Sequence, residues 1–317
     1  NMLYQNNGSG SFTDVASSAG VNDANNAEGA TWADYNNDGL VDLYVANHST
    51  NNLLYKNDGD GTFTDDASAA GVQGAASATI SAAWADYDND GDFDLYVGNN
   101  SSTSDQLFSN DGDGTFTDAT SSAGVTNTND VVGLAWADYD NDGNIDLFAN
   151  GVSVADKMWL NNGDGTFTDV AAAAGLTDTG AGRGVAWGDI DANGTQDLYV
   201  VNTGTANLLY LNNGHATNRY LRVELEGVDS NEYGYGAEVT LSEAGVFRQT
   251  KVIDSGSGWN SQGAEVLNFG IGAVVTVDSV IVKWPTGRVQ VTLGINGNQL
   301  TTVTEPSGLI KFSEVGV

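Results

Sequence analysis

The chain has 317 residues, of which 40% are hydrophobic, and it contains two histidines and no cysteine. Its 42 acidic and 10 basic residues give a formal net charge of −32, which excludes unaided contact with nucleic acid or an anionic membrane. The same composition excludes disulfides, cysteine redox chemistry and zinc sites, whereas the length allows two domains with their own cores.

Two short segments begin the chain, Leu3-Tyr-Gln-Asn-Asn-Gly and Phe12-Thr-Asp, and both patterns recur later as the last two strands of a repeat. We therefore expect the chain to begin inside a repeat unit. Residues 12–16 could close a small ring by completing the last unit, although residues 3–5 would then be surplus. The alternative is that the chain is a piece of a longer repeat array, and the sequence leaves both open.

A nine-residue acidic loop follows and occurs four times, each time two residues after a Trp. The copies, called loops 1 to 4, are Asp34-Tyr-Asn-Asn-Asp-Gly-Leu-Val-Asp42, Asp86-Tyr-Asp-Asn-Asp-Gly-Asp-Phe-Asp94, Asp138-Tyr-Asp-Asn-Asp-Gly-Asn-Ile-Asp146 and Asp189-Ile-Asp-Ala-Asn-Gly-Thr-Gln-Asp197. Oxygen side chains at positions 1, 3, 5 and 9, with glycine at position 6, form the pattern that cages a hard cation such as calcium. An EF-hand would need a carboxylate at position 12, where the chain has Val45, Val97, Ala149 and Val200. An ordinary Asn/Asp/Gly turn needs no Asp at position 9.

We expect about four calcium ions per chain, one in each loop. The predicted ligands are the side chains at positions 1, 3, 5 and 9 and the backbone carbonyl at position 7, where the side-chain type varies. They are Asp34, Asn36, Asp38, Leu40 and Asp42 in loop 1; Asp86, Asp88, Asp90, Asp92 and Asp94 in loop 2; Asp138, Asp140, Asp142, Asn144 and Asp146 in loop 3; and Asp189, Asp191, Asn193, Thr195 and Asp197 in loop 4.

The loops recur every 51 or 52 residues, as their Trp residues show: Trp32, Trp84, Trp136 and Trp187. Each interval contains a Trp strand, a strand after the acidic loop, and two more short apolar runs joined by an Asn/Asp-Gly-Asp-Gly turn. A repeat of about 50 residues with four strands is the unit of a β-propeller blade. We interpret the Trp residues as packing between blades rather than as a sugar-stacking ring, and the Gly-Asp-Gly hairpins as turns rather than further ion sites.

Beyond about residue 214 the repeats stop, and most of the Lys and Arg residues lie from Arg219 onward. Alternating segments such as Tyr220-Leu-Arg-Val-Glu-Leu and Val280-Ile-Val-Lys-Trp predict half-buried antiparallel strands. The predicted fold class is all-β, with a β-propeller at residues 1–214 and an antiparallel, sandwich-like domain at residues 215–317. Residues 257–262, with Trp259, are interpreted as a structural loop rather than a ligand site.

On these motifs residues 1–214 resemble the FG-GAP/VCBS-like repeats best known from the integrin α-subunit propeller. The Phe-Gly and Gly-Ala-Pro signature is replaced by Ala-Trp-Ala-Asp-Tyr, which points to the bacterial VCBS-like branch. Tyr235-Gly-Ala-Glu-Val, Gly256-Ser-Gly-Trp-Asn-Ser-Gln262, Leu267-Asn-Phe-Gly-Ile-Gly272 and Lys283-Trp-Pro-Thr-Gly287 are similar to the ASPIC/UnbV domain, which follows such repeats in the cartilage acidic protein family and its bacterial relatives.

No catalytic residue is expected, because His48 and His215 are interpreted as surface residues and most Asp residues belong to loops and turns. Two functions remain: a calcium-binding extracellular interaction or adhesion module with a protein partner, as the resemblance implies, and a calcium-dependent, lectin-like glycan-binding propeller. We expect a secreted or surface-attached bacterial protein without a membrane span. Its incomplete blades would allow an oligomer.

Overall fold

The computed structural model describes residues 1–74, 78–100, 103–244, 247–253 and 265–307. The segment around Trp259 lies outside the described residues.

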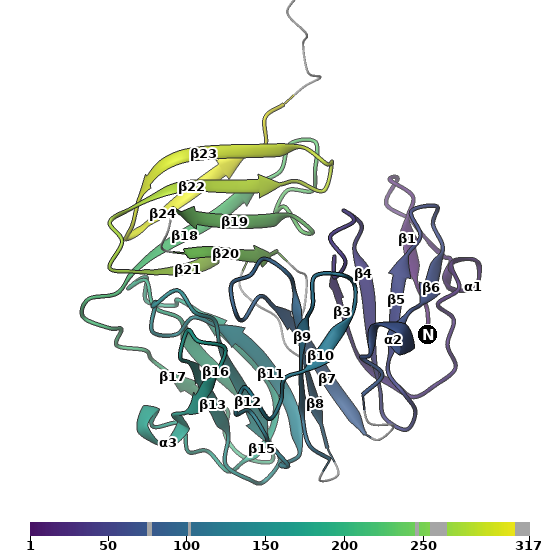
Figure 1. Ribbon diagram of the computed structural model, residues 1–317, viewed down its shortest axis with the longest axis horizontal. Helices are drawn as coiled ribbons and strands as arrows, with labels where there is room; N and C mark the ends of the chain where they lie inside the picture. Colours follow the sequence, from purple (N-terminus) through teal and green to yellow (C-terminus); the bar gives the residue numbers. More distant parts are fainter. Residues whose placement is uncertain (75–77, 101–102, 245–246, 254–264, 308–317) are drawn as a thin grey trace, which may run out of the picture.

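Four antiparallel sheets, called blades 1 to 4, follow one another along the chain (Figure 1). Blade 1 contains β3 (Ala27–Ala33), β4 (Asp42–Asn47), β5 (Leu53–Asn57) and β6 (Phe63–Asp65). Blade 2 contains β7 (Thr79–Ala85), β8 (Asp94–Asn99), β9 (Gln106–Asn110) and β10 (Phe116–Asp118). Blade 3 contains β11 (Val131–Ala137), β12 (Asp146–Gly151), β13 (Lys157–Asn161) and β14 (Phe167–Asp169). Blade 4 has three strands, β15 (Ala181–Gly188), β16 (Asp197–Thr203) and β17 (Leu208–Tyr210).

The hydrophobic cores of the repeats lie between neighbouring blades. In one of them Tyr44 and Leu54 of blade 1 pack with Leu95 and Phe116 of blade 2. The second strand of blades 1 to 3 is buried along its whole length, because both of its faces are covered. Neighbouring blades cover blades 2 and 3, whereas Ala16, Ala19 and Val21, in and after α1, cover the free face of blade 1. This packing of successive sheets face to face is the propeller-like arrangement that the sequence predicts.

The repeated Trp residues pack between blades, as the sequence predicts: Trp84, Trp136 and Trp187 contact Tyr44, Tyr96 and Phe148 of the preceding blade, with ring centroids 6.2, 6.2 and 6.3 Å apart. Within a blade, Trp residues also pack against the Phe of the fourth strand. The ring centroids of Trp84 and Phe116 lie 6.0 Å apart, and those of Trp136 and Phe167 lie 6.2 Å apart. Trp32 makes the same contact with Phe63 but remains 37% exposed, because no complete blade precedes it in the described chain.

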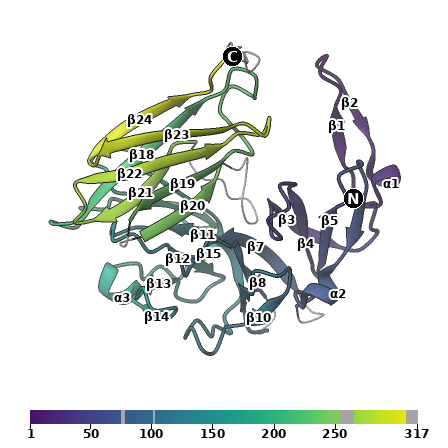
Figure 2. The ribbon, with the colours of Figure 1, turned by 45° about the horizontal axis from the view of Figure 1, so that its top comes forward.

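The closed-ring alternative is not realised in the structure. Strand β2 (Phe12–Asp14) pairs with β1 (Tyr4–Asn6), and blade 4 ends at β17 without a fourth strand among the described residues. Figure 2 shows the β1–β2 hairpin on the opposite side of the molecule from blade 4. Phe12 is consequently 62% exposed, whereas the equivalent Phe116 and Phe167 are buried.

Three one-turn helices, which the sequence analysis did not predict, follow fourth strands: α1 (Ala16–Ala19), α2 (Ala67–Ala70) and α3 (Ala171–Ala174). The Asp that ends each preceding strand accepts the N–H of the first helical residue, at 3.0 Å for Asp14 and 3.1 Å for Asp65 and Asp169. In the part of the chain that the structure describes, no helix is long and apolar enough to span a membrane.

Two further sheets, together called the C-terminal sandwich, enclose a separate core around Leu221, Val239, Phe269 and Trp284. One sheet has the order β21 (Leu267–Gly272), β18 (Arg219–Glu226), β24 (Gln299–Thr304), and the other β20 (Phe247–Val252), β19 (Glu238–Glu243), β22 (Thr276–Lys283), β23 (Val289–Asn296). The strands pair antiparallel, as predicted, except for β18 and β24, which run parallel. Alternation of buried and exposed residues fixes which face a strand buries but not its direction, so the sequence pattern could not indicate that this pair is parallel.

Candidate metal sites in the acidic loops

Each acidic loop joins the first strand of a blade to the second, so the four loops lie at the same end of the blades. We call this end the loop face, and the C-terminal sandwich lies over it (Figure 1). Position 9 is the first residue of the second strand in every blade, at Asp42, Asp94, Asp146 and Asp197. The fold therefore fixes one end of every loop at a buried Asp that begins the second strand.

The position-9 carboxylates close the loops through backbone hydrogen bonds. In loop 3 one oxygen of Asp146 accepts the N–H of Tyr139, at 3.0 Å, and the other accepts the N–H of Asn161, at 2.9 Å. Loops 1, 2 and 4 repeat this pair of bonds through Asp42, Asp94 and Asp197. Position 9 is thus both a predicted ligand and the residue that ties the loop to the third strand.

The position-1 carboxylates point into the loops. Those of Asp34, Asp138 and Asp189 accept the backbone N–H groups of positions 5 and 6, at 2.8 to 3.1 Å. Asp86 is the exception, since both of its oxygens are buried, which raises its pKa, and the N–H groups of Gly91 and Asp90, which oppose that shift, lie outside hydrogen-bond geometry. A buried, unpartnered carboxylate is costly, and a bound cation would remove that cost.

Positions 3 and 5 shape the turn. The side-chain oxygen of position 3 accepts the N–H of position 5, and that of position 5 accepts the N–H of position 7, as in Asp140 to Asp142 (3.2 Å) and Asp142 to Asn144 (2.8 Å). The polar side chains at position 7, in loops 2 to 4, bond to neighbouring groups; Thr195, for example, donates to the carbonyl of Asn212 at 2.9 Å. Ligation through the position-7 carbonyl stays a prediction.

Carboxylate oxygens gather in three of the four loops. The groups Asp86, Asp88 and Asp90, then Asp138, Asp140 and Asp146, then Asp189, Asp191 and Asp197 each place one oxygen per residue within 4.8 Å of the others. Loop 1 has Asn36 at position 3 and offers an amide oxygen instead. A set of several close oxygen donors with mixed carboxylate and carbonyl character fits calcium, which takes six to eight oxygen ligands.

Burial and mutual repulsion disfavour the ionised form of these carboxyls when no cation is present. Burial raises the pKa of Asp42 to about 7, with neighbouring carboxylates adding to the shift. It likewise raises the pKa of Asp86 and of Asp138 to about 7, although the Lys251 ammonium opposes the shift at Asp138. The pKa values of Asp94 and Asp146 lie well above their usual range for the same reason. Cation binding and ionisation of these groups therefore favour each other.

Position 4, which the sequence analysis did not single out, links each loop to the next. Asn37 donates to the carboxylate of Asp92, Asn89 to the carbonyl of Gly143 at 3.3 Å, and Asn141 to the carbonyl of Gly194 at 3.0 Å. Loop 4 has no following loop, and its position 4 is Ala192. The signal was present in the sequence as Asn in three copies and Ala in the last.

The Gly-Asp-Gly hairpins behave as turns. The carboxylate of Asp60 accepts both the N–H and the hydroxyl of Thr62, at 3.1 and 2.6 Å, and Asp113 and Asp164 bind their threonines in the same way. These carboxylates lie at the surface, so the turn interpretation accounts for them.

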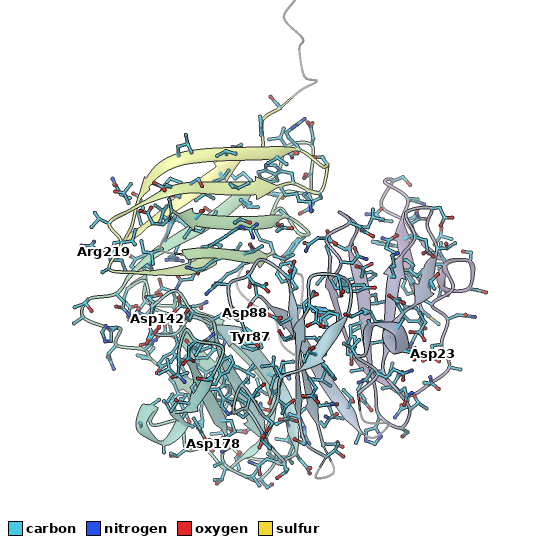
Figure 3. The ribbon with its side chains drawn as sticks, viewed as in Figure 1. Asp23, Tyr87, Asp88, Asp142, Asp178 and Arg219 are labelled. Carbon is cyan, nitrogen blue, oxygen red and sulfur yellow. The ribbon has the colours of Figure 1, made fainter. Side chains whose placement is uncertain are left out.

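A cavity of about 650 Å³ lies between loops 2 and 3 and the C-terminal sandwich. Its polar wall is formed by Asp88, Asn89, Asp142 and Asn144, and its opposite wall by Arg248 and residues 271–274. Figure 3 shows Tyr87, Asp88 and Asp142 near the base of the sandwich, whereas Asp178 lies at the far end of the blades. The cavity thus opens beside predicted metal ligands of two loops.

Two family models match the chain. Residues 1–45, 34–97, 94–149 and 139–200 match the FG-GAP-like repeat, and residues 227–310 match the model named ASPIC and UnbV. Cartilage acidic protein 1 of Homo sapiens is 28% identical over 307 residues, which cover 92% of this chain and 46% of the human protein. Cartilage acidic protein 1 of Mus musculus is also 28% identical over 307 residues, covering 92% of this chain and 47% of the mouse protein. The chain therefore spans about half the length of these curated relatives.

Two solved structures are distantly similar. A lectin of Agrocybe aegerita, described as recognising non-reducing terminal N-acetylglucosamine, gives a TM-score of 0.39 at 21% identity and covers 67% of this chain and 60% of its own. The biofilm matrix protein Bap1 of V. cholerae gives a TM-score of 0.32 at 12% identity, covering 84% of this chain and 59% of its own.

Proposed function

The chain belongs to the FG-GAP-like repeat family, and on that premise we propose that it is a calcium-binding interaction module that acts outside cells and has no catalytic activity of its own. The observation that carries the proposal is the convergence of three carboxylates in each of loops 2, 3 and 4. The two unpartnered, buried oxygens of Asp86 add to it, because a cation would supply the partner that they lack.

In this proposal each loop would hold its ion through positions 1, 3, 5 and 9 and the carbonyl of position 7. Calcium would supply positive charge that holds the loop carboxylates together and so stiffens the loop face. The chain's own residues do the rest: the position-9 Asp ties the loop to the third strand, and the position-4 Asn ties it to the next loop. The result would be a rigid, ordered surface, which is what an interaction module requires.

An extracellular setting is supported by the chemistry of the sites. Loops of this kind fill where calcium is abundant, and extracellular modules have dissociation constants of about 10⁻⁴ to 10⁻³ M. The curated relatives carry the name cartilage acidic protein, which agrees with such a setting. Proteolysis of intact cells, followed by detection of the chain, would test it: protection from external protease would contradict a surface or secreted location.

Calcium titration of wild type and of two matched variants tests the metal sites. Asp86→Asn removes a predicted ligand from loop 2, and Asp60→Asn removes the same charge from an exposed hairpin. We expect Asp86→Asn to weaken or abolish one site while Asp60→Asn matches wild type. A wild-type chain that takes up no calcium at millimolar concentration, or two variants with the same isotherm, would contradict the proposal.

A second candidate function, calcium-dependent glycan binding, is favoured by the cavity between loops 2 and 3. Its carboxylate and amide groups suit the hydroxyls of a sugar, and Ile271 and Val274 offer an apolar wall. Glycan-array binding that disappears with a chelator would support this candidate. Capture of a protein receptor, with no glycan bound at millimolar calcium, would support the first.

A further inference from the structure

We propose that the C-terminal sandwich sets the calcium affinity of the individual loops, because it places a basic side chain beside each of the four. This inference rests on the proposed calcium binding and adds its regulation. The side chains are Lys283 at loop 1, Arg248 at loop 2, Lys251 at loop 3 and Arg222 at loop 4. Arg222 lies on β18, Arg248 and Lys251 lie on β20, and Lys283 ends β22.

Loop 4 has the tightest of these contacts. Nη1 of Arg222 donates to Oδ2 of Asp189 at 2.9 Å, and the Asp189 side chain is only 3% exposed. The same oxygen accepts the N–H of Gly194 at 3.0 Å. Tyr220 covers Gly194 so closely that a β-carbon there would clash with its ring. A guanidinium is therefore fixed on one of the three carboxylates of loop 4.

Loops 1 and 3 have intermediate contacts. Nζ of Lys283 lies 3.5 Å from Oδ2 of Asp34, but this lysine side chain is 40% exposed and is shared with Glu238 at 3.6 Å. Lys251 donates to the carbonyl of Asn268, at 2.5 Å, on the strand whose Gly270 packs directly against Oδ2 of Asp138 in loop 3. Water screens the first lysine more than the second.

The negative charge of loop 2 is the least neutralised by basic side chains of the sandwich. It contains five Asp residues, and neither oxygen of Asp86 has a partner. Arg248 approaches its backbone at Gly91, where an added β-carbon would collide with the guanidinium, but Arg248 is itself exposed. This loop keeps the largest unbalanced negative charge of the four.

A fixed positive charge beside a ligand carboxylate opposes the binding of a second cation, and ligand charge is the main variable that tunes calcium affinity in oxygen cages. The four loops should therefore differ in calcium affinity, with loop 2 binding most tightly and loop 4 most weakly. Loops 1 and 4, which have equal numbers of carboxylates, should differ because Arg222 is bonded to the buried carboxylate of Asp189, whereas Lys283 is exposed.

Calcium titration calorimetry on the full chain tests the assignment through Arg222. Arg222→Gln removes the charge, Arg222→Lys keeps it, and Arg183→Gln removes the same charge from β15 of the same blade, where the side chain donates to the Gly182 carbonyl. We expect Arg222→Gln to lower the dissociation constant of the weakest site about tenfold, the effect of about 1.4 kcal/mol in binding free energy. Arg222→Lys and Arg183→Gln should stay close to wild type.

The site is identified by a double-mutant cycle with Asp189→Ala, which removes both the carboxylate that Arg222 contacts and a predicted ligand of loop 4. In that background the gain from Arg222→Gln should vanish. An unchanged or weaker weakest site in Arg222→Gln would overturn the inference, as would a gain that persists with Asp189→Ala. These outcomes presuppose wild-type calcium binding, so a wild-type chain that binds none would refute the proposed function instead.

Discussion

Replacing Asp178 with an asparagine should stabilise the protein, because the buried carboxylate of Asp156 beside it lacks a hydrogen-bond donor. Blade 2 shows which donors such a carboxylate uses. In blade 2 one oxygen of Asp105 accepts the hydroxyl of Tyr96, at 3.1 Å, and the amide of Asn127, at 2.8 Å. The equivalent Asp156 in blade 3 has Phe148 and Asp178 at those two positions. Oδ2 of Asp156 is consequently buried without a partner, and a second carboxylate stands where a donor is required.

The size of the effect follows from this comparison. A buried polar group without a partner costs about 1 to 3 kcal/mol, so an amide donor at position 178 should recover about that much unfolding free energy. The side-chain oxygen that remains after Asp178→Asn can still accept the amide of Asn202, which the carboxylate now binds at 2.6 Å, so that bond need not be lost. No other contact has to change.

The gain should depend on pH. Burial raises the pKa of Asp156 to about 7, and Asp178 adds to that shift. A carboxyl whose pKa is higher when folded than its unfolded value of about 4 holds its proton more tightly in the folded state, so its contribution falls as pH rises from about 4 to about 7. Asp178→Asn should flatten this fall and help most above pH 7.

Urea denaturation at pH 5 and pH 8 in saturating calcium measures the difference while the loop carboxylates are held by the metal. Glu232→Gln is the matched control, since it removes one negative charge at an exposed position. If the two variants gain equally at pH 8, only the overall charge matters. If Asp178→Asn shows no gain at pH 8, the account of Asp156 is refuted.

Three further outcomes are expected. Gly270→Ala should weaken the packing of the sandwich against loop 3, because the added β-carbon would clash with Oδ2 of Asp138 and lie 2.5 Å from the Asn141 backbone. Calorimetry should show a lower melting temperature for this variant than for Gly188→Ala, where the β-carbon would have open space. Asn141→Ala should cost about 1 kcal/mol of unfolding free energy, measured in urea, since the bond to the Gly194 carbonyl is lost, whereas Asn162→Ala, in an exposed hairpin, should cost less. Chelating calcium should lower the melting temperature of the repeats more than that of the sandwich. The loss of unfolding free energy is about 2.7 kcal/mol per site when free calcium is about 100 times its dissociation constant. An unchanged thermogram would count against the loops as metal sites.

The repeated loops could be predicted from sequence because each of their features is local. Glycine at position 6, with φ of 103° in Gly143, and the Asx turns at positions 3 and 5 depend on residues only a few positions apart. The strands follow from alternation and from turns of similarly short range. The link from Asn141 to Gly194 was missed because it joins residues 53 positions apart, and only a comparison of position 4 across the copies could have indicated it.

The packing of the C-terminal sandwich on the loop face could not be predicted from the sequence, for a different reason. Arg222 alternates with the core residues Leu221 and Val223 along β18, so its pattern predicts only that it points away from the sandwich core. Lys251 lies on a strand without such an alternation, and its pattern predicts no direction. What they point at depends on how two folded units pack. Gly270, which lets β21 approach Asp138, has no mark in the sequence that distinguishes it from any other strand glycine.

The contacts across the loop face imply that calcium binding at the four loops, as proposed, would be coupled. Each position-4 Asn is held by the backbone or carboxylate of the next loop, so ordering of one loop by a cation restrains the donor side of the loop before it. Asn268 of the sandwich also donates to the Gly194 carbonyl, at 3.4 Å, the same acceptor that Asn141 uses. Calcium in loop 4 would therefore bear on loop 3 and on the sandwich through one shared oxygen. In a chain with a net charge of −32, binding at one loop also lowers the repulsion felt by the others, so the electrostatic and the hydrogen-bonded couplings have the same sign.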